Sequence, residues 1–549
     1  MFKCLQSDYE SWLISTAKGS KNENFSDNGL SHTSASSTLG LAYQWYMSCR
    51  GCHRTCSQRS KRSRWYPTRL IDIGAKGDTE WKIINTSGRS LASPNYVTLS
   101  YRWGFSPALK LTCSTTQAFY RGMPFSILPQ TYKDTVKIAR RFSVRYIWID
   151  SLCIFQDSRE DWERESSTMR DVYANSACNI AATASTNPEG GLFRERQLRD
   201  VQPGNLTVSL LTPEEENYCV LEGLYWNCQI TNAPLHRRGW VFQECILAPR
   251  VLYFGKDQIL WECFKERKCE AFPQGIPLIR TLKNLELFSY PADTNTDTNS
   301  PLSRDAFEFW NQIVDAYSQC ELTRSNDKLI ALSGLAHLFQ AVTGEEYIAG
   351  LWKSRLKESL DWRVYKPRAK VSSSYHAPSW SWASIDGPVY PCGITTGSTY
   401  LIDILDTGVS NSKIDPLGQV YNGFIVVKGV LTETIYYTLD QGNSACILEA
   451  NGYNLSAFVY GDTSDTHLEG GTLVHCLALK SYPTSYGGFS DSFALMGLVL
   501  QRELETAGEF SRIGHFHMNG VDAIERFGIH IGSENTPLST VESSVIKII

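Results

Sequence analysis

Four common catalytic signatures are missing from this sequence. It contains no Walker-type phosphate loop, no dinucleotide-type Gly-x-Gly-x-x-Gly, no His-Glu-x-x-His and no Gly-x-Ser-x-Gly. These motifs carry the phosphate cradles, zinc ligands and nucleophile elbow of P-loop NTPases, Rossmann dehydrogenases, zincins and α/β-hydrolases. Their absence argues against all four enzyme classes.

Long apolar runs and an excess of charge are missing as well. The first fifteen residues, MFKCLQSDYESWLIS, hold no apolar run long enough for a signal peptide, and no later stretch is long enough for a bilayer span. The net charge of −4 offers no general attraction to nucleic acid or to an anionic membrane. We therefore expect a cytoplasmic, intracellular protein with no membrane partner, and nucleic acid is not an expected partner.

The length and composition are those of a multidomain globular protein. The chain has 549 residues, of which 42% are hydrophobic, so more than one core is expected. Because no secretory route is visible, the 16 cysteines are expected to be reduced thiols rather than a disulfide framework.

One short segment is dense in zinc-type ligands: Cys49, Cys52, His53 and Cys56 lie within eight residues. Adjacent Cys52 and His53 are awkward as simultaneous ligands, and no second cluster stands nearby at finger spacing. Zinc binding stays open as an alternative. The favoured interpretation is a reduced, structural cysteine segment, so no metal site is predicted.

The fold class predicted from the pattern is α/β. Short apolar strands at Tyr96–Tyr101, Tyr146–Ile149 and Ala177–Ser185 alternate with helical patterns, which favours a mainly parallel sheet wrapped by helices. The expected domains are a partly disordered region with the Cys/His segment over 1–95, the α/β domain over 96–250, a mostly helical region over 251–370 and a β-rich region over 371–549.

Further elements are predicted by periodicity. Helices are expected at Tyr132–Phe142, Phe307–Tyr317, Leu329–Gln340 and Tyr347–Leu360, and a loop entering a helix is expected at Leu235–Leu247. Strands are expected at Val251–Phe254, Phe424–Leu431, Leu473–Leu479 and Phe493–Leu500, and the period-two alternation of Ser379–Trp382 also favours a strand.

The stretch from Tyr146 to Tyr173 reads as a buried strand, a polar turn and an amphipathic helix. Asp157 stands three residues before Glu160, the spacing of a helix N-cap with its capping partner. Glu165 falls on the same helical face as Trp162 and Met169. A carboxylate on an apolar face must be paired, neutralised or used, because burying it bare is costly.

Arg238, Gly239 and Trp240 precede a helical pattern. If a helix starts near Gly239, its free N–H groups and the arginines form a plausible anion site. A structural Arg–Glu pair with Trp240 in the core is the alternative.

Three blocks together resemble the heterokaryon incompatibility (HET) domain of filamentous fungi: Tyr96 to Gly104, Tyr146 to Tyr173, and Arg238-Gly239-Trp240 with Gln243-Glu244 and Arg250. The resemblance covers about Tyr96 to Arg250. It implies a role in non-self recognition and programmed cell death after unlike hyphae fuse, together with an incompatibility partner protein of unknown identity.

The HET domain is in turn similar to TIR domains, which have a flavodoxin-like α/β core. Some TIR domains cleave NAD with a glutamate that follows a tryptophan on a helix, and others only assemble into scaffolds. The resemblance therefore implies Glu165 as the catalytic residue beside Trp162, with NAD as substrate and no cofactor. The structural alternative for Glu165 is a buried ion pair with Arg102 or Arg238.

The remaining ligand-binding candidates follow from strand direction. Ser100, Tyr101 and Trp103 leave one strand at its carboxyl end, and Asp150 and Cys153 leave another at the same edge, where open α/β sheets bind ligands. Arg238, Gly239 and Trp240 complete the predicted ligand-binding set. The competing function is a non-enzymatic signalling module that acts through self-association of HET domains.

Overall fold

The structure is a computed structural model of the chain. It describes residues 12–15, 31–58, 65–88, 91–93, 95–104, 109–201, 204–208, 216–222, 225–276, 282–283, 302–368, 375–438, 445–464, 468–484, 492–506, 508–531, 537–539 and 543–549. The chain forms two compact units, Met1–Ser289 and Tyr290–Ile549. Residues 16–30 of the region expected to be partly disordered, and the basic run Lys61–Arg64, lie outside the described residues.

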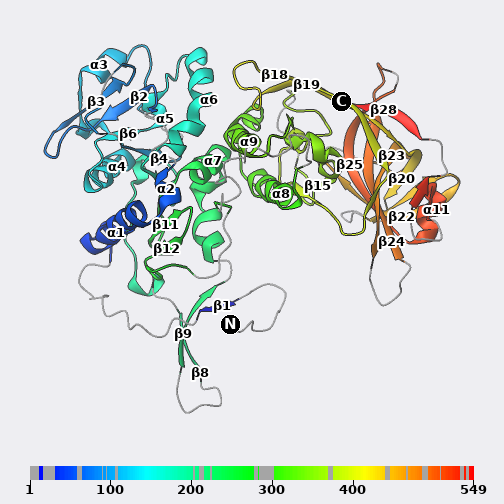
Figure 1. The fold of residues 1–549 in the computed structure, drawn as a ribbon, viewed down its shortest axis with the longest axis horizontal. Helices are drawn as coiled ribbons and strands as arrows, with labels where there is room; N and C mark the ends of the chain where they lie inside the picture. The colour runs from blue at the N-terminus through cyan, green and yellow to red at the C-terminus, as the bar shows by residue number, and fades with distance from the viewer. Residues whose placement is uncertain are drawn as a thin grey trace. The chain divides into compact units, whose positions relative to one another are not determined.

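The first unit is built on a nine-stranded mixed sheet (Figure 1). Its strands are, in sheet order, β12 (Arg267–Cys269), β11 (Ile259–Cys263), β10 (Arg250–Phe254), β7 (Cys178–Ala181), β4 (Tyr96–Ser100), β6 (Tyr146–Trp148), β2 (Arg69–Asp72), β3 (Glu80–Asn85) and β5 (Met123–Pro124). The four central strands β10, β7, β4 and β6 are parallel, and those on either side are antiparallel. The α/β class is therefore confirmed, but the sheet is mixed.

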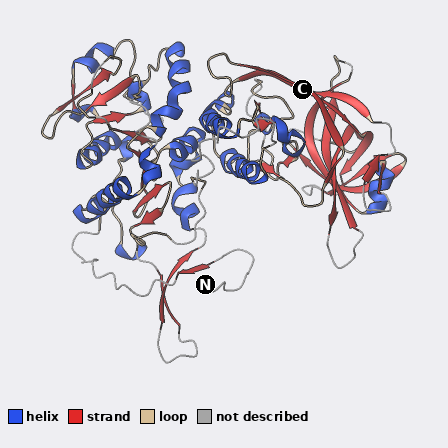
Figure 2. Cartoon of the chain, viewed as in Figure 1, coloured by secondary structure: helices blue, strands red, loops and turns tan. Residues whose placement is uncertain are grey.

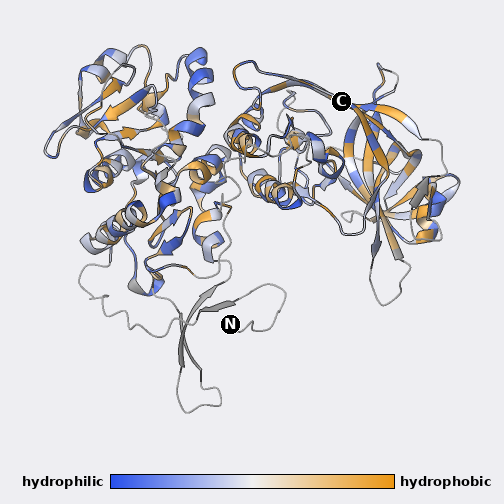
Figure 3. Ribbon diagram, viewed as in Figure 1, coloured by the Kyte–Doolittle hydropathy of each residue, from blue (hydrophilic) through white to orange (hydrophobic). Residues whose placement is uncertain are grey.

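The central strands are short apolar runs because both of their faces are covered. Every residue of β4, β6, β7 and β10 is buried, as parallel strands between helical layers require. Orange, the hydrophobic end of the scale, appears on strands in the interior of this unit (Figure 3). The register pairs Val97 with both Ile147 and Cys178, so β4 lies at the centre.

Seven helices are described in this unit (Figure 2). They are α1 (Ser36–Cys52), α2 (Arg54–Gln58), α3 (Thr116–Arg121), α4 (Gln130–Arg141), α5 (Asp150–Cys153), α6 (Arg159–Ala174) and α7 (Gly239–Leu247). Helix α4 lies against β6, α5 against β2 and α1 against β11. Strands β1 (Trp12–Ser15), β9 (Glu216–Glu222) and β8 (Gly204–Val208) form a separate antiparallel sheet.

The predicted strands, and the helices α4, α6 and α7, are confirmed, but the predicted N-cap is wrong. Helix α6 is capped by Ser158, whose side chain accepts a hydrogen bond from the Asp161 amide. Asp157 instead accepts from the Cys113 amide at 2.8 Å. Asp157 and Ser158 are both short polar residues that can cap a helix. The sequence alone could not show that the Cys113 amide, from a distant loop, would bind the Asp157 carboxylate and leave the cap to Ser158.

The second unit opens with two helices, α8 (Arg304–Ser318) and α9 (Ile330–Thr343), close to their predicted positions. Ser303 caps α8 by accepting from the Ala306 amide, and α9 ends at Gly344, whose φ of 72° is left-handed. Trp310 of α8 packs edge-on against Trp352 at a centroid distance of 5.1 Å.

The helix predicted over Tyr347–Leu360 is wrong. Strands β13 (Tyr347–Ile348) and β14 (Leu351–Trp352) pair as a hairpin, and the helical part is limited to a 3-10 turn at Lys353–Arg355 followed by α10 (Leu356–Ser359). Ala349 and Gly350 have φ values of 46° and 99°, which a helix cannot hold and a two-residue hairpin turn requires.

The strand predicted at Ser379–Trp382 is also wrong. Ser381 caps a short 3-10 turn, Trp382–Ser384, by accepting from the Ala383 amide. Trp380 and Trp382 are both buried, the first offering its carbonyl to Trp362 Nε1 at 3.1 Å and the second donating to the Gly350 carbonyl at 2.9 Å.

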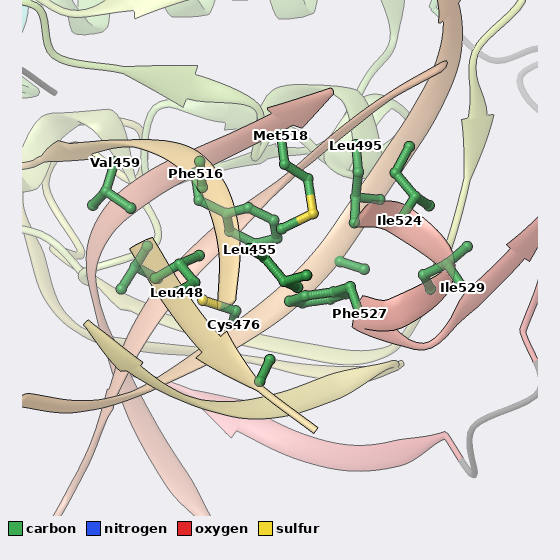
Figure 4. Packing of buried hydrophobic residues seen from close by; sticks show 14 of the residues in the cluster. Leu448, Leu455, Val459, Cys476, Leu495, Phe516, Met518, Ile524, Phe527 and Ile529 are labelled. Atoms are coloured by element: carbon green, nitrogen blue, oxygen red, sulfur yellow. The ribbon is translucent and has the colours of Figure 1, made fainter. Parts of the chain in front are cut away.

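Six strands of the second unit close on themselves. In order around the ring they are β23 (Thr472–Thr484), β20 (Leu431–Thr438), β21 (Ala445–Ala450), β22 (Tyr453–Gly461), β25 (Glu509–Asn519) and β24 (Ser492–Arg502), each antiparallel to the next. Their inner face holds Leu448, Leu455 and Phe516, and α11 (Val521–Phe527) adds Ile524 and Phe527 (Figure 4). Further strands of this unit are β28 (Ser544–Ile548), β19 (Val420–Gly429), β18 (Ile402–Asn411), β17 (Thr399–Tyr400), β15 (Trp362–Arg363), β16 (Tyr390–Pro391), β26 (Ile529–Ile531) and β27 (Pro537–Ser539).

The strands predicted over Phe424–Leu431, Leu473–Leu479 and Phe493–Leu500 are confirmed as β19, β23 and β24. Among the described residues, no helix is both long and apolar enough to cross a membrane.

Candidate functional site

Six polar and aromatic residues meet where β4 and β6 end and α7 begins. We call them the motif cluster; they are Ser100, Tyr101, Trp103, Asp150, Arg238 and Glu244. Ser100 is the last residue of β4, and Tyr101 and Trp103 follow it. One residue separates Asp150 from β6, and Asp150 begins α5. Arg238 immediately precedes α7, which carries Glu244. Because β4 and β6 are parallel, their carboxyl ends share one edge of the sheet.

The inner side of the motif cluster is a buried hydrogen-bond chain. Ser100 Oγ donates to Glu244 Oε2, and Asn179 Nδ2 of β7 donates to Ser100 Oγ at 2.9 Å. Thr98 Oγ1 donates to Asn179 Oδ1 at 3.0 Å. Ser100 and Glu244 are 1% and 5% exposed, so this chain is sealed from water.

Glu244 is the most perturbed carboxylate of the motif cluster. Burial raises its pKa to about 7, although Arg238 and the hydroxyls of Ser100 and Tyr173 act in the opposite direction. A carboxyl group that is half protonated near neutral pH can donate as well as accept a proton.

The outer side of the motif cluster is partly open to solvent, because Trp103, Asp150 and Arg238 are half-buried. Trp103 Nε1 donates to Asp150 Oδ2 at 2.8 Å, and the Ser151 amide donates to Asp150 Oδ1 at 2.7 Å. Arg238 Nη1 donates to the Tyr101 carbonyl. Burial raises the pKa of Asp150, and the positive charge of Arg238 opposes this rise. The same arginine also lowers the pKa of Glu244, so it acts on both carboxylates.

Glu165 lies in a different cluster, which we call the arginine cluster: Arg69, Asp161, Arg164 and Glu165. Glu165 Oε1 is 3.7 Å from Arg69 Nη2 and 3.4 Å from Arg164 Nε. Arg69 also makes a bidentate pair with Asp161, including Nη1 to Oδ2 at 3.0 Å. Burial raises the pKa of Glu165 and the Arg69 charge opposes it.

Glu165 therefore pairs with Arg69 of β2 and Arg164 of its own helix, and not with Arg102 or Arg238. Arg102 donates to the Pro234 carbonyl at 3.3 Å, and Arg238 belongs to the motif cluster. The helical face prediction was sound, since Glu165 is only 3% exposed, but Asp161 one turn earlier shares that face.

The predicted ligand-binding residues fall into three places. Ser100, Tyr101, Trp103, Asp150 and Arg238 are together in the motif cluster. Cys153 lies beside the arginine cluster, where its carbonyl accepts from Arg69 Nη1 at 2.8 Å. The Trp162 and Trp240 rings contact each other edge-on at 6.4 Å, which joins α6 to α7, and Gly239 is the first residue of α7.

Helix α6 meets the motif cluster through Tyr173 rather than Glu165. The Tyr173 hydroxyl is a hydrogen-bond partner of Glu244. Eight residues separate Glu165 from Tyr173, a rise of roughly 12 Å along a helix. Glu165 and Glu244 therefore belong to two distinct groups of contacts.

The sequence reasoning missed Glu244, Asn179, Arg69 and Asp161. Glu244 was visible within the third motif block, where a glutamate in an otherwise apolar helix is the same signal that singled out Glu165. Arg69 had no comparable signal, because it lies in a strand far from its partners in the chain.

A further group of side chains could hold a metal ion. Cys49, His53 and Cys56 converge with Cys263 of β11, which the sequence reasoning did not connect with them, while Cys52 is exposed.

Residues 96–244 match the family model described as heterokaryon incompatibility protein (HET). The chain carries a HET domain. The matched segment runs from the first residue of β4 to Glu244, so the motif cluster lies inside it from end to end. Comparisons with curated proteins and with solved structures gave no match.

The resemblance to the HET family is thereby confirmed for residues 96–244. The HET domain's sheet also takes strands from outside the matched segment, since β2 and β3 precede it and β10, β11 and β12 follow it. The similarity to TIR domains stays a prediction.

Proposed function

We propose that this HET domain acts in non-self recognition and cell death after fusion of unlike hyphae, by cleaving the nicotinamide–ribose bond of NAD. The observation that supports this is the motif cluster. It places Asp150 and Glu244, two carboxylates with raised pKa values, beside Arg238 at the carboxyl edge of parallel strands. This edge is where open α/β sheets bind ligands.

The chemistry of the bond suits such a cluster. Nicotinamide leaves as a neutral pyridine from a cationic one, so the leaving group needs no general acid. The ribose develops oxocarbenium character, which a fixed carboxylate in a site of low dielectric constant can stabilise. Water then bonds to the anomeric carbon, which gives ADP-ribose and releases a proton.

Glu244 is the stronger candidate for that carboxylate on electrostatic grounds. Its partners Ser100 and Tyr173 are neutral hydroxyls, which the hydroxyls of a ribose could replace. Glu165 faces the guanidinium groups of Arg69 and Arg164, which already neutralise its charge. Arg238 would meet the diphosphate, since guanidinium groups bind phosphate oxygens by paired hydrogen bonds.

The catalytic role of Glu165 that the TIR similarity implies is proposed as the alternative. The purified full chain is incubated with NAD, and nicotinamide is measured by chromatography for the wild type, Glu244→Gln and Glu165→Gln. Glu163→Gln is the matched control, because Glu163 lies on the same helix in an exposed pair with Arg159.

We expect Glu244→Gln to lower turnover by about 10²-fold or more and Glu163→Gln to leave it unchanged. If only Glu165→Gln lost turnover while its melting temperature stayed that of the wild type, the catalytic role would pass to Glu165. Absence of nicotinamide release from the wild type would end the enzymatic proposal.

A second candidate function is a non-enzymatic module that works through HET-domain self-association and an incompatibility partner protein. The observation that favours it is that every carboxylate of the two clusters already has partners and that Glu165 and Glu244 are nearly sealed from solvent. Cell death on overexpression should then survive Glu244→Gln, and light scattering should show concentration-dependent oligomers.

A further inference from the structure

Three cysteines and one histidine of the first unit converge on a point next to the sheet. Cys49 lies in the last turn of α1, His53 at the break between α1 and α2, Cys56 in α2, and Cys263 at the end of β11. Their ligand atoms all lie within 4.8 Å of one another. His53 and Cys263 are 210 positions apart in the chain, yet His53 Nδ1 is 3.4 Å from Cys263 Sγ.

These distances fit a tetrahedral zinc ion. Zn–S bonds of about 2.3 Å and Zn–N bonds of about 2.0 Å place neighbouring ligand atoms roughly 3.5–3.8 Å apart. Three thiolates and one imidazole form a four-ligand set that is typical of structural zinc. Cys49, Cys56 and Cys263 are at most 1% exposed, so the sulfur atoms are shielded from oxidants and solvent.

The backbone explains how the three local ligands are aimed. Helix α1 ends at Cys52, and the His53 amide closes it by donating to the Cys49 carbonyl at 3.0 Å. The chain then turns into α2, which brings Cys56 back toward Cys49. Cys52, the competing neighbour of His53, is exposed and lies outside the group, so adjacent residues do not have to share one ion.

Two buried cations lie near these sulfur atoms. Arg250 Nε donates to Cys49 Sγ at 3.2 Å, and the Phe264 amide donates to the Cys56 sulfur. The Lys283 ammonium acts on Cys56 and Cys263 through its charge. Three thiolates and a divalent zinc carry one net negative charge, which these buried cations compensate.

A second group of ligand-type side chains gives a useful contrast. Asp361, Cys392 and His515 of the second unit also lie close together. There, Lys480 Nζ is 2.5 Å from Asp361 Oδ2, and its side chain is fully buried. The ammonium group of Lys480 already pairs with a carboxylate oxygen of that group, so we do not propose a metal ion there.

We propose that Cys49, His53, Cys56 and Cys263 bind one structural zinc ion, which fastens the α1–α2 segment to β11. Helices α1 and α2 precede the segment that matches the HET family model, and β11 follows it. The ion would therefore join the two flanks of the matched segment near one edge of the sheet. Strand β11 pairs with β10, and β10 with the parallel core.

The first test measures metal content. The full chain is purified without a metal-affinity tag, and zinc is quantified by mass spectrometry for the wild type, Cys263→Ser and Cys52→Ser. We expect one zinc per chain in the wild type and in Cys52→Ser, and loss of zinc in Cys263→Ser. Cys52 is the matched control because it is a cysteine of the same segment that lies outside the group.

The second test does not depend on removing a ligand. His53→Cys keeps four ligands, so it should retain the metal and, with cobalt in place of zinc, show stronger thiolate-to-metal charge-transfer absorption than the wild type. A wild-type chain that holds no zinc even after zinc is added would overturn the proposal. Equal zinc loss from Cys52→Ser and Cys263→Ser, or unchanged cobalt absorption in metal-loaded His53→Cys, would overturn it as well.

Discussion

Ser100 at the end of β4 hydrogen-bonds Glu244 of α7, 144 positions later in the chain. This contact joins the first motif of the HET domain to its last residue, across a buried sheet edge. This hydrogen bond therefore connects the two ends of the matched segment, and its effect on the free energy of unfolding can be measured.

Replacing Ser100 with alanine should destabilise the first unit. Glu244 would lose a buried hydrogen bond, and Asn179 Nδ2 would lose its oxygen acceptor and keep only the sulfur of Cys245, at a cost of about 1–3 kcal/mol. Urea unfolding followed by fluorescence measures the change. Ser167→Ala is the control, because the Ser167 hydroxyl donates only to the Arg164 carbonyl of its own helix, at the surface. The unfolding free energy of this variant should stay within about 0.5 kcal/mol of that of the wild type.

The raised pKa of Glu244 makes stability depend on pH. Its pKa is about 7 in the folded chain against an ordinary value of 4.5, so the folded state binds the proton more tightly. The protonated Glu244 carboxyl therefore contributes on the order of 3 kcal/mol to the free energy of unfolding below pH 4.5, and this contribution is lost as the pH rises through about 7.

The groups that face this carboxyl are Ser100, Asp150, Tyr173 and Arg238, of which Arg238 lowers its pKa and Asp150 raises it. Glu244→Gln should therefore remove this contribution, which is measured as the difference between the unfolding free energies of the wild type and the variant from pH 4.5 to 7. An equally steep profile in this variant would assign the dependence to another group.

Arg69 should be the most sensitive position of the arginine cluster. Its guanidinium group neutralises Asp161 and Glu165, and all three side chains are nearly fully buried. Arg69→Met leaves two carboxylates buried with only Arg164 beside them, which should cost about 3–5 kcal/mol. Denaturant titration measures this cost.

Arg159→Met is the matched control for Arg69→Met. Arg159 pairs with Glu163 on the same helix, but its side chain is 86% exposed, so solvent screens the pair. A similar loss in both variants would mean that side-chain packing, and not the burial of unpaired charge, sets the cost.

The elements that the sequence predicted correctly are those specified by local periodicity. Strands β4 and β6 are continuous apolar runs, and α6 carries its buried residues at helical spacing, so each needs only its own neighbours to be recognised. The hairpin at Tyr347–Trp352 was missed because its apolar run has helical length, while the turn depends on the backbone of Ala349 and Gly350.

The sites were harder to predict, because their contacts are long-range. Strand direction alone placed Ser100, Tyr101, Trp103 and Asp150 at one sheet edge, whereas Arg238 was predicted only from the helix that it precedes. Whether Glu165 of α6 or Glu244 of α7 lies among these residues depends on how the two helices pack at that edge, and the sequence does not show this packing. The pairing of β11 with β10 likewise decides that Cys263 joins Cys49, and no local spacing contains that information.

Removing zinc should loosen one edge of the first unit and leave the second unit unchanged. Metal bound only by the folded state stabilises it in proportion to the logarithm of its concentration over Kd, about 4 kcal/mol at a thousandfold excess. Amide hydrogen exchange with a strong chelator present should therefore show faster exchange in α1, α2 and β11. Peptides from β23 and β24 of the closed sheet provide the internal control, because that sheet holds none of the four ligands. Faster exchange in the closed sheet alone, or unchanged exchange in α1 and β11 after zinc is shown to be removed, would contradict the proposal that the ion holds the α1–α2 segment against β11.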